Sequence, residues 1–211
     1  MGNLEIRTVV VGALQTNCYL LKNKTTQEIL IVDPGDDAVR IEQQIAQCDG
    51  KVAGILLTHG HYDHTLAAEE LRSFYHVDIY APKSEEKLLL SPAQNMSGGW
   101  RSKPYSLAAD HFLEDGQMLS LAGFSMEVLY TPGHTAGSSC YYLEEEEVLL
   151  SGDTLFAGSM GRTDLPTGDT RQMEHSLQRL AQIMPERVRV YPGHGSSTDI
   201  GYEKMYNPYM R

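Results

Sequence analysis

Short apolar runs rich in β-branched residues recur along the chain, and each ends abruptly at a glycine, at a proline or at Thr-His-Gly. Runs of this kind predict β-strands. We expect strands at residues 29–32, 55–57, 128–130, 148–150 and 188–191. Several of these runs are apolar at consecutive positions instead of alternating with polar residues. Both faces of the corresponding strands must therefore be covered by other elements.

Apolar residues with helical spacing fill the stretches between these strands and predict helices at residues 38–46, 65–75, 85–90 and 171–183. The helix at 65–75 is expected to have an apolar face of Leu66, Leu71 and Phe74. The helix at 171–183 is expected to have one of Met173, Leu177, Leu180 and Ile183. Strands mixed with helices indicate an α/β or α+β protein, and a helix-sheet-sheet-helix sandwich covers every strand twice. A single doubly wound sheet is the alternative, but the chain has no glycine-rich phosphate-binding motif.

Length and composition favour one domain spanning residues 1–211, because no low-complexity linker or repeat divides the chain. The 28 acidic residues outnumber the 17 basic ones, and this net charge of −11 argues against a nucleic-acid partner. No apolar stretch approaches a membrane span and no leader pattern is visible, so we expect a cytoplasmic protein without a membrane partner. Cys18, Cys48 and Cys140 form no CxxC pair, which fits buried thiols in a reducing compartment.

Metal-ligand side chains are concentrated in the sequence HGHYDH at residues 59–64, directly after the second predicted strand. In an extended turn, residues two positions apart project to the same side, so His59 and His61 can share one ion. Asp63 and His64 fall at the start of the next predicted helix, where they can hold a second ion. The run therefore predicts a centre for two metal ions.

Single ligand-type residues follow three other strands, each directly after a glycine: His134, Asp153 and His194. A lone histidine at a strand end is more often a hydrogen-bonded loop residue than a metal ligand. Four imidazole or carboxylate groups within six positions are different, because they would strand buried polar groups unless a cation lay between them. The HGHYDH run thus supports the three single residues as ligands. The other histidines are expected at the surface: His76, His111 and His175.

The chain resembles the metallo-β-lactamase fold superfamily and, within it, the short bacterial glyoxalase II-like (hydroxyacylglutathione hydrolase-like) enzymes. The matching motifs are Asp33 after the early strand, THGHYDH at 58–64, TPGHTAGS at 131–138, SGDTLF at 151–156 and YPGHG at 191–195. They occur in the family's order with family-like spacing, over almost the whole chain. The resemblance is more specific for the fold and the metal site than for the substrate.

The resemblance implies a single-domain, four-layer αββα sandwich with a two-metal centre along its edge. It assigns the first metal to His59, His61 and His134, the second to Asp63, His64 and His194, and a bridging position to Asp153. Asp63 and Asp153 are the candidate catalytic residues. Zinc is the expected divalent ion, and iron or manganese also suits nitrogen and oxygen ligands. Asp33 matches the family's structural aspartate, and a helix N-cap is the alternative role for it.

The expected chemistry is hydrolysis by a hydroxide that bridges the two ions, because metal binding makes water a nucleophile at neutral pH. Thioesters such as S-lactoylglutathione suit this site, since a thiolate leaves without a strong general acid. The main alternative is an iron-dependent persulfide dioxygenase of the same fold, which needs only the first-metal ligands. A third possibility is a non-catalytic metal-binding or redox-sensing module. Nuclease and flavin-linked di-iron functions fit less well, because the chain is acidic and HGHYDH lacks the glutamate of the di-iron proteins.

The sequence says less about substrate contacts. Typical glyoxalase II enzymes carry a C-terminal helical domain that binds glutathione, whereas seventeen residues follow His194 in this sequence, so that domain is not expected. Two divalent ions outweigh two aspartates and a hydroxide by one positive charge, which favours a small anionic thioester. Arg162 is a candidate for binding its carboxylate, or else pairs with Asp164. Trp100 and Tyr105, in the aperiodic stretch at 91–111, are candidate walls of the cleft. No oligomeric state is predicted.

Overall fold

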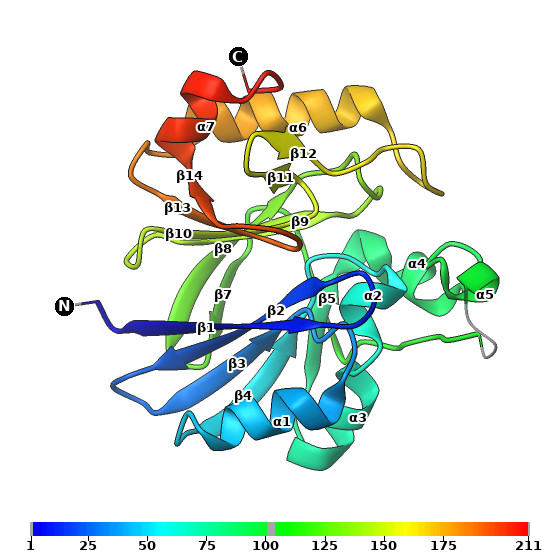
Figure 1. Ribbon diagram of the computed structural model, residues 1–211, viewed down its shortest axis with the longest axis vertical. Helices are drawn as coiled ribbons and strands as arrows, with labels where there is room; N and C mark the ends of the chain where they lie inside the picture. The colour runs from blue at the N-terminus through cyan, green and yellow to red at the C-terminus, as the bar shows by residue number, and fades with distance from the viewer. Residues whose placement is uncertain (1, 101–103, 211) are drawn as a thin grey trace.

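Two sheets packed face to face form the centre of the computed structural model, which describes residues 2–100 and 104–210, without the side chain of Trp100. Figure 1 shows α1 and α3 below the blue and cyan strands, and α6 and α7 above the strands coloured green to red. The four-layer αββα sandwich predicted from the sequence is confirmed. No helix in the described part of the chain is both long and apolar enough to cross a membrane.

The N-terminal half contributes one six-stranded sheet, the helices α1 and α3 on its outer face, and shorter helices at one edge (Figure 1). The sheet order is β1-β2-β3-β4-β5-β6, in which β1 to β3 are antiparallel neighbours and β3 to β6 run parallel. The strands are β1 (Leu4–Val11), β2 (Thr16–Asn23), β3 (Glu28–Val32), β4 (Lys51–Leu56), β5 (Ile79–Pro82) and β6 (His111–Leu113). The helices are α1 (Ala38–Ala46), α2 (Tyr62–Thr65), α3 (Ala68–Tyr75), the 3-10 helix η1 (Lys83–Glu85), α4 (Glu86–Leu90) and α5 (Ser97–Trp100).

The C-terminal half repeats this layering with a second six-stranded sheet. Its order is β14-β13-β10-β9-β8-β7, and only β10 and β13 pair in parallel. The elements are β7 (Met118–Leu121), β8 (Phe124–Tyr130), β9 (Ser139–Leu143), β10 (Val148–Gly152), β13 (Arg189–Pro192), β14 (Thr198–Asp199), α6 (Thr170–Ile183) and α7 (Ile200–Tyr206). A separate small hairpin consists of β11 (Leu155–Phe156) and β12 (Ser159–Met160).

Strand β3 shows why the apolar runs do not alternate with polar residues. Ile29 and Ile31 point into the core beneath α1 and α3, whereas Leu30 and Val32 point into the core between the two sheets. Successive residues of a strand face opposite sides, so a strand buried on both sides needs apolar residues at every position. The double covering inferred from the sequence is thus present in the structure.

The predicted apolar helix faces are wrong at one end of α3 and of α6. Phe74 and Ile183 are 61% and 47% exposed, while Tyr75 packs against the first core and Met184 is buried in the core beneath α6. In both cases the residue four positions after a buried leucine takes the inward place, and the residue three positions after it turns outward. Both spacings suit a helix face, and packing against the sheet selects between them.

The C-terminal ends of β3, β4, β8, β10 and β13 meet at one edge of the sandwich, because the first two strands run parallel in one sheet and the other three point the same way in the second. Hydroxyl groups tie the two sheets together there: Tyr19 donates to the carbonyl of Pro192 and Tyr141 to that of Leu57, both at 2.6 Å. A β-bridge between Thr16 and His194 closes the same edge. Loops that leave these five strands therefore share one space.

Candidate metal centre

All seven ligand-type residues that the sequence singles out lie together at this edge. Their nitrogen and oxygen atoms form three groups, within each of which the atoms lie no more than 4.8 Å apart. The groups are His59, His61 and His134; His59, His64 and Asp153; and Asp63, His64 and His194. The loops after β4, β8, β10 and β13 supply five of the seven residues, and the short helix α2, which follows the loop after β4, supplies Asp63 and His64.

The first group, which we call the three-histidine cluster, consists of His59, His61 and His134 and is buried. Nδ1 of His61 lies 2.9 Å from Nε2 of His134. Nε2 of His59 and Nε2 of His61 are buried without a hydrogen-bond partner. Burying a polar atom without a hydrogen-bond partner costs free energy. The two nitrogens therefore indicate a bound ligand that they share.

The second group, which we call the aspartate cluster, consists of Asp63, His64 and His194. Nε2 of His194 lies 3.2 Å from Nε2 of His64 and 3.4 Å from Oδ2 of Asp63. This group is more open, because the side chains of His194 and Asp63 are 26% and 15% exposed. Solvent and substrate can thus reach the centre from the side of the aspartate cluster.

Asp153 lies between the two clusters. Its Oδ1 is 3.4 Å from Nε2 of His64, and its Oδ2 is 3.4 Å from Nε2 of His134 and 3.5 Å from Nε2 of His194. Oδ1 is also buried without a hydrogen-bond partner. The carboxylate thus lies within reach of both clusters, which agrees with the bridging position that the resemblance implies for it.

Outer contacts hold three of the imidazoles by the nitrogen that faces away from the centre. Nδ1 of His64 lies 3.0 Å from Oδ2 of Asp33, that of His134 lies 2.7 Å from the carbonyl of Arg162, and that of His194 lies 3.1 Å from the carbonyl of Leu14. A second hydrogen bond of this kind fixes the ring orientation and directs the other nitrogen toward a metal.

Asp33 has a structural role and does not cap a helix. Its two oxygens accept hydrogen bonds from the backbone N–H and the hydroxyl of Thr58, at 2.8 and 2.6 Å, besides contacting His64. The N-cap position of α1 is Asp37, so the alternative of a helix cap is wrong. The turn between Asp33 and α1 instead places Asp33 against Thr58 and His64, beside the candidate metal ligands.

The histidines of the two clusters differ in the direction of their pKa shifts. Burial, together with the neighbouring imidazoles, holds the pKa of His59 well below its usual value and lowers the pKa of His61 to about 3. Both rings are therefore neutral at pH 7. A neutral imidazole is the form that binds a metal ion, so the three-histidine cluster is ready for one without losing protons.

The aspartate cluster holds protons instead. Burial opposes protonation of His64, but three neighbouring carboxylates outweigh it and raise the pKa of His64 to about 10. They belong to Asp153, Asp63 and Asp33. Burial likewise opposes the charged form of His194, yet the hydrogen bond that its ring donates to Asp63 raises its pKa. A bound cation would take over the part that these protons play beside the carboxylates.

The residues present fit divalent metal ions. Six imidazole and carboxylate ligands together with Asp153 converge, several of their buried atoms lack other partners, and outer hydrogen bonds orient the rings. Gly193 makes room for this arrangement, because a Cβ atom there would fall 2.2 Å from Oδ1 of Asp153. Gly152 adopts a φ of +48°, which few other residues tolerate, and so turns the chain sharply from β10 into Asp153.

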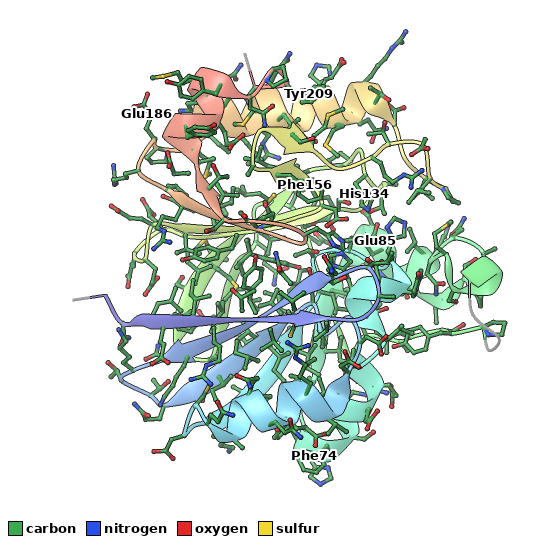
Figure 2. The ribbon with its side chains drawn as sticks, in the orientation of Figure 1. Phe74, Glu85, His134, Phe156, Glu186 and Tyr209 are labelled. Atoms are coloured by element: carbon green, nitrogen blue, oxygen red, sulfur yellow. The ribbon has the colours of Figure 1, made fainter. Side chains whose placement is uncertain are left out.

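A pocket of about 450 Å³ opens over the metal centre. Besides ligand residues it is lined by Leu14, Tyr62, Met96, Phe156, Met160, Arg162 and Leu165. Arg162 lines the pocket as expected, but its guanidinium also makes two hydrogen bonds to the carboxylate of Asp164, at 2.7 and 2.8 Å. Figure 2 shows Phe156 and His134 near each other at the junction of the two halves.

The predictions that Tyr105 and Trp100 form walls of the cleft have different outcomes. Tyr105 does not line the pocket, because its ring packs against the core beneath the first sheet and its hydroxyl donates to the carbonyl of Thr65 at 2.8 Å. The aperiodic stretch contributes Met96 to the pocket instead. The side chain of Trp100 lies outside the described part of the structure, so its prediction stays a prediction.

The expectations for the other histidines and the cysteines are confirmed. His76, His111 and His175 are exposed, and the three cysteines are buried and unpaired. The sequence reasoning missed Glu85, a buried carboxylate beside the loops that bear the ligands. No local signal marks it, because it precedes the partly exposed Glu86 in a polar run that is typical of a solvated helix start.

The chain belongs to the metallo-beta-lactamase superfamily, whose domain matches residues 11–194. "Probable metallo-hydrolase YqgX" of Bacillus subtilis (strain 168) is 36% identical over 208 residues, which cover 98% of each chain. "Hydroxyacylglutathione hydrolase GloC" of Haemophilus influenzae is 35% identical over 209 residues, again 98% of each chain. The family resemblance inferred from the motifs is thus confirmed.

Solved structures agree with this assignment. The BLEG-1 B3 metallo-beta-lactamase has a TM-score of 0.92 at 38% identity and covers 98% of this chain and 99% of its own. TTHA1623 in a di-iron-bound form has a TM-score of 0.85 at 34% identity, with 96% and 99% covered. ETHE1 from Myxococcus xanthus has a TM-score of 0.79 at 27% identity, with 97% and 83% covered.

Proposed function

We propose that this protein hydrolyses an acyl thioester of a small thiol, such as S-lactoylglutathione, with the help of two divalent metal ions. The observation that carries the proposal is the placement of Asp153 between two complete ligand clusters, at 3.4 Å from a histidine of each. The similarity to a hydroxyacylglutathione hydrolase over the full chain supports the thioester as substrate. Zinc is the metal we propose first, and the di-iron-bound relative makes iron the metal to compare with it.

The three-histidine cluster would hold one ion, the aspartate cluster the other, and Asp153 both. Such ions supply a hydroxide at neutral pH and polarise the carbonyl that it attacks. The protein's own contribution is to orient the imidazoles, through Asp33 for His64 and a backbone carbonyl for His134. No separate general acid is needed, because the departing thiolate is already a stable anion.

The pocket walls would hold the rest of the substrate. Leu14, Met96, Phe156 and Leu165 provide apolar surface that excludes water from the reacting carbonyl. Arg162 is the one guanidinium or ammonium group among the described residues that line the pocket. We propose that it meets a carboxylate of an anionic thioester when it is not paired with Asp164.

The test is a product assay on the purified full chain, with metals counted by elemental analysis. With S-lactoylglutathione, and with a lactoyl thioester of an uncharged thiol, we expect free thiol and carboxylate in equal amounts and no oxygen uptake. Metal content should approach two ions per chain in protein grown with ample zinc. Active protein that never holds more than one ion would contradict the two-metal proposal.

The second candidate function is an iron-dependent persulfide dioxygenase. The observation that favours it is that His59, His61 and His134 form a ligand group by themselves, without the aspartate cluster. Oxygen uptake and sulfite from a persulfide, without thioester turnover, would support this candidate. A chain that binds metal but does neither would instead be a non-catalytic metal-binding module.

A further inference from the structure

Glu85 is a fully buried carboxylate outside the set of metal ligands. It is 1% exposed and ends η1, just after β5. Its Oε2 accepts a hydrogen bond from the backbone N–H of Gly60 at 2.7 Å. Its Oε1 accepts two more, from the hydroxyl of Thr135 at 2.9 Å and from the backbone N–H of Gly137 at 2.8 Å.

The three donors belong to the two loops that carry the three-histidine cluster. Gly60 stands between His59 and His61, and Thr135 directly follows His134. Figure 2 shows Glu85 beside His134, where the two halves of the sandwich meet. One side chain thus connects the ligand loop of the first sheet to the ligand loop of the second.

We propose that Glu85 is a positioning residue for the three-histidine cluster, which holds the loop of His59 and His61 in register with the loop of His134. The proposal depends on the metal centre but not on the thioester activity. A cluster drawn from two sheets can form a tight site only if the two loops keep a fixed separation. The hydrogen bonds of Asp33, in contrast, reach His64 in the aspartate cluster.

A carboxylate is the side chain that this position requires. All three partners are donors, and a carboxylate offers only acceptor sites. In Glu85→Gln the amide nitrogen would have to face the backbone N–H of Gly60 or that of Gly137, so at least one of these N–H groups loses its acceptor. The fit is also close, because a Cβ atom on Gly137 would lie 2.6 Å from Oε1 of Glu85.

Glu203 offers a matched control for the cost of changing a buried glutamate. It is also buried and also accepts three kinds of hydrogen bond, from Gly158, Thr198 and Asn207. None of these partners adjoins a metal ligand in the sequence. Glu203→Gln should therefore destabilise the fold without changing either metal cluster. Glu86→Gln, at a partly exposed neighbour of Glu85, is the control for charge.

The experiment measures zinc affinity at each cluster by competition with a chelator, using the full chain. Asp63→Asn leaves the three-histidine cluster as the one complete site, and His61→Ala leaves the aspartate cluster. In the first background we expect Glu85→Gln to weaken zinc binding by about 10- to 100-fold, the range for a lost outer partner of a ligand. In the second background we expect less than about a threefold change. Glu203→Gln and Glu86→Gln should leave both affinities unaltered.

Equal effects of Glu85→Gln in the two backgrounds would overturn the proposal, as would an effect no larger than that of Glu203→Gln. A milder pair of variants applies if Glu85→Gln does not fold. Thr135→Val removes the hydroxyl that reaches Glu85, and Thr135→Ser keeps it. Thr135→Val should weaken zinc binding at the three-histidine cluster and Thr135→Ser should restore it. Equal affinities for the two would also contradict the assignment.

Discussion

The two metal clusters lie side by side but differ in burial, in the number of carboxylates and in the direction of their histidine pKa shifts. The three-histidine cluster is buried and has no carboxylate apart from the shared Asp153, and the pKa values of His59 and His61 are lowered. The aspartate cluster is partly open, and its carboxylates raise the pKa of His64 to about 10. His59 and His61 are therefore neutral at pH 7, whereas in the aspartate cluster a protonated His64 and the neighbouring carboxylates balance one another's charge.

This difference indicates that the two bound ions would have different roles. Buried neutral imidazoles gain most from a cation, because the Nε2 atoms of His59 and His61 have no other partner. The aspartate cluster can remain satisfied by protons, and it faces the pocket through Asp63 and His194. We expect the first ion to be bound mainly for structure and positioning, and the second to be the more easily exchanged and the more sensitive to conditions.

The largest expected effect comes from removing the carboxylate that both clusters share. Asp153→Ala should lose both ions and all measurable hydrolysis, because each cluster loses a direct ligand. The loss should exceed the roughly 10- to 100-fold typical of an outer partner. Elemental analysis and thioester assays check it, with His59→Ala as a second variant that loses metal. One tightly held ion in Asp153→Ala would show that the aspartate does not bridge.

A variant of the aspartate cluster should separate the two candidate chemistries. Asp63→Asn keeps the shape of the side chain but weakens the second ion, so we expect hydrolysis to fall by about 100-fold or more while the first ion stays bound. His64→Ala should behave alike. A dioxygenase that uses only the three-histidine cluster would keep its oxygen uptake in both variants, and that result would decide for the second candidate function.

The pH dependence of zinc binding should differ between the clusters. His61 has a pKa of about 3 and is already neutral at pH 7, so binding at the three-histidine cluster should release few protons. His64 has a pKa of about 10, so zinc must displace its proton at every pH below that value. Affinity at the aspartate cluster should then rise about tenfold per pH unit for one displaced proton. Calorimetry of His61→Ala and Asp63→Asn at pH 6 to 8 measures this; equal slopes would contradict it.

The smallest effect is expected at the rim of the pocket. Arg162 is 63% exposed and bound to Asp164, so Arg162→Ala should leave metal content unchanged and raise KM by a few-fold for an anionic thioester. KM for a neutral thioester should change less. Arg162→Lys keeps the charge but loses the fork of two hydrogen bonds, and should resemble the alanine variant. Equal effects on both substrates would assign Arg162 to the loop alone.

Local patterns predicted the elements well and singled out the ligand-type residues that the fold brings together, because both depend on neighbours in the chain. The helix at residues 38–46 is α1 with the predicted bounds, and the strand at 148–150 lies inside β10. The HGHYDH run could be recognised because its four ligand residues stand within six positions. The exposed Phe74 shows the limit: helical spacing allowed Phe74 or Tyr75 on the inner face, and only packing against the sheet selected Tyr75.

The sequence by itself determined that strands would be covered on both sides and that a metal-binding set would gather at their ends, since periodicity and ligand chemistry can be read from neighbouring residues. Only the tertiary structure decided how the set is held. Glu85 and Gly137 are 52 positions apart, and their contact exists because two sheets bring their loops together. Nothing in the residues around Glu85 distinguishes it from Glu86, whose side chain stays 41% exposed. Burial and partners are properties of the packed loops, and a linear pattern does not contain them.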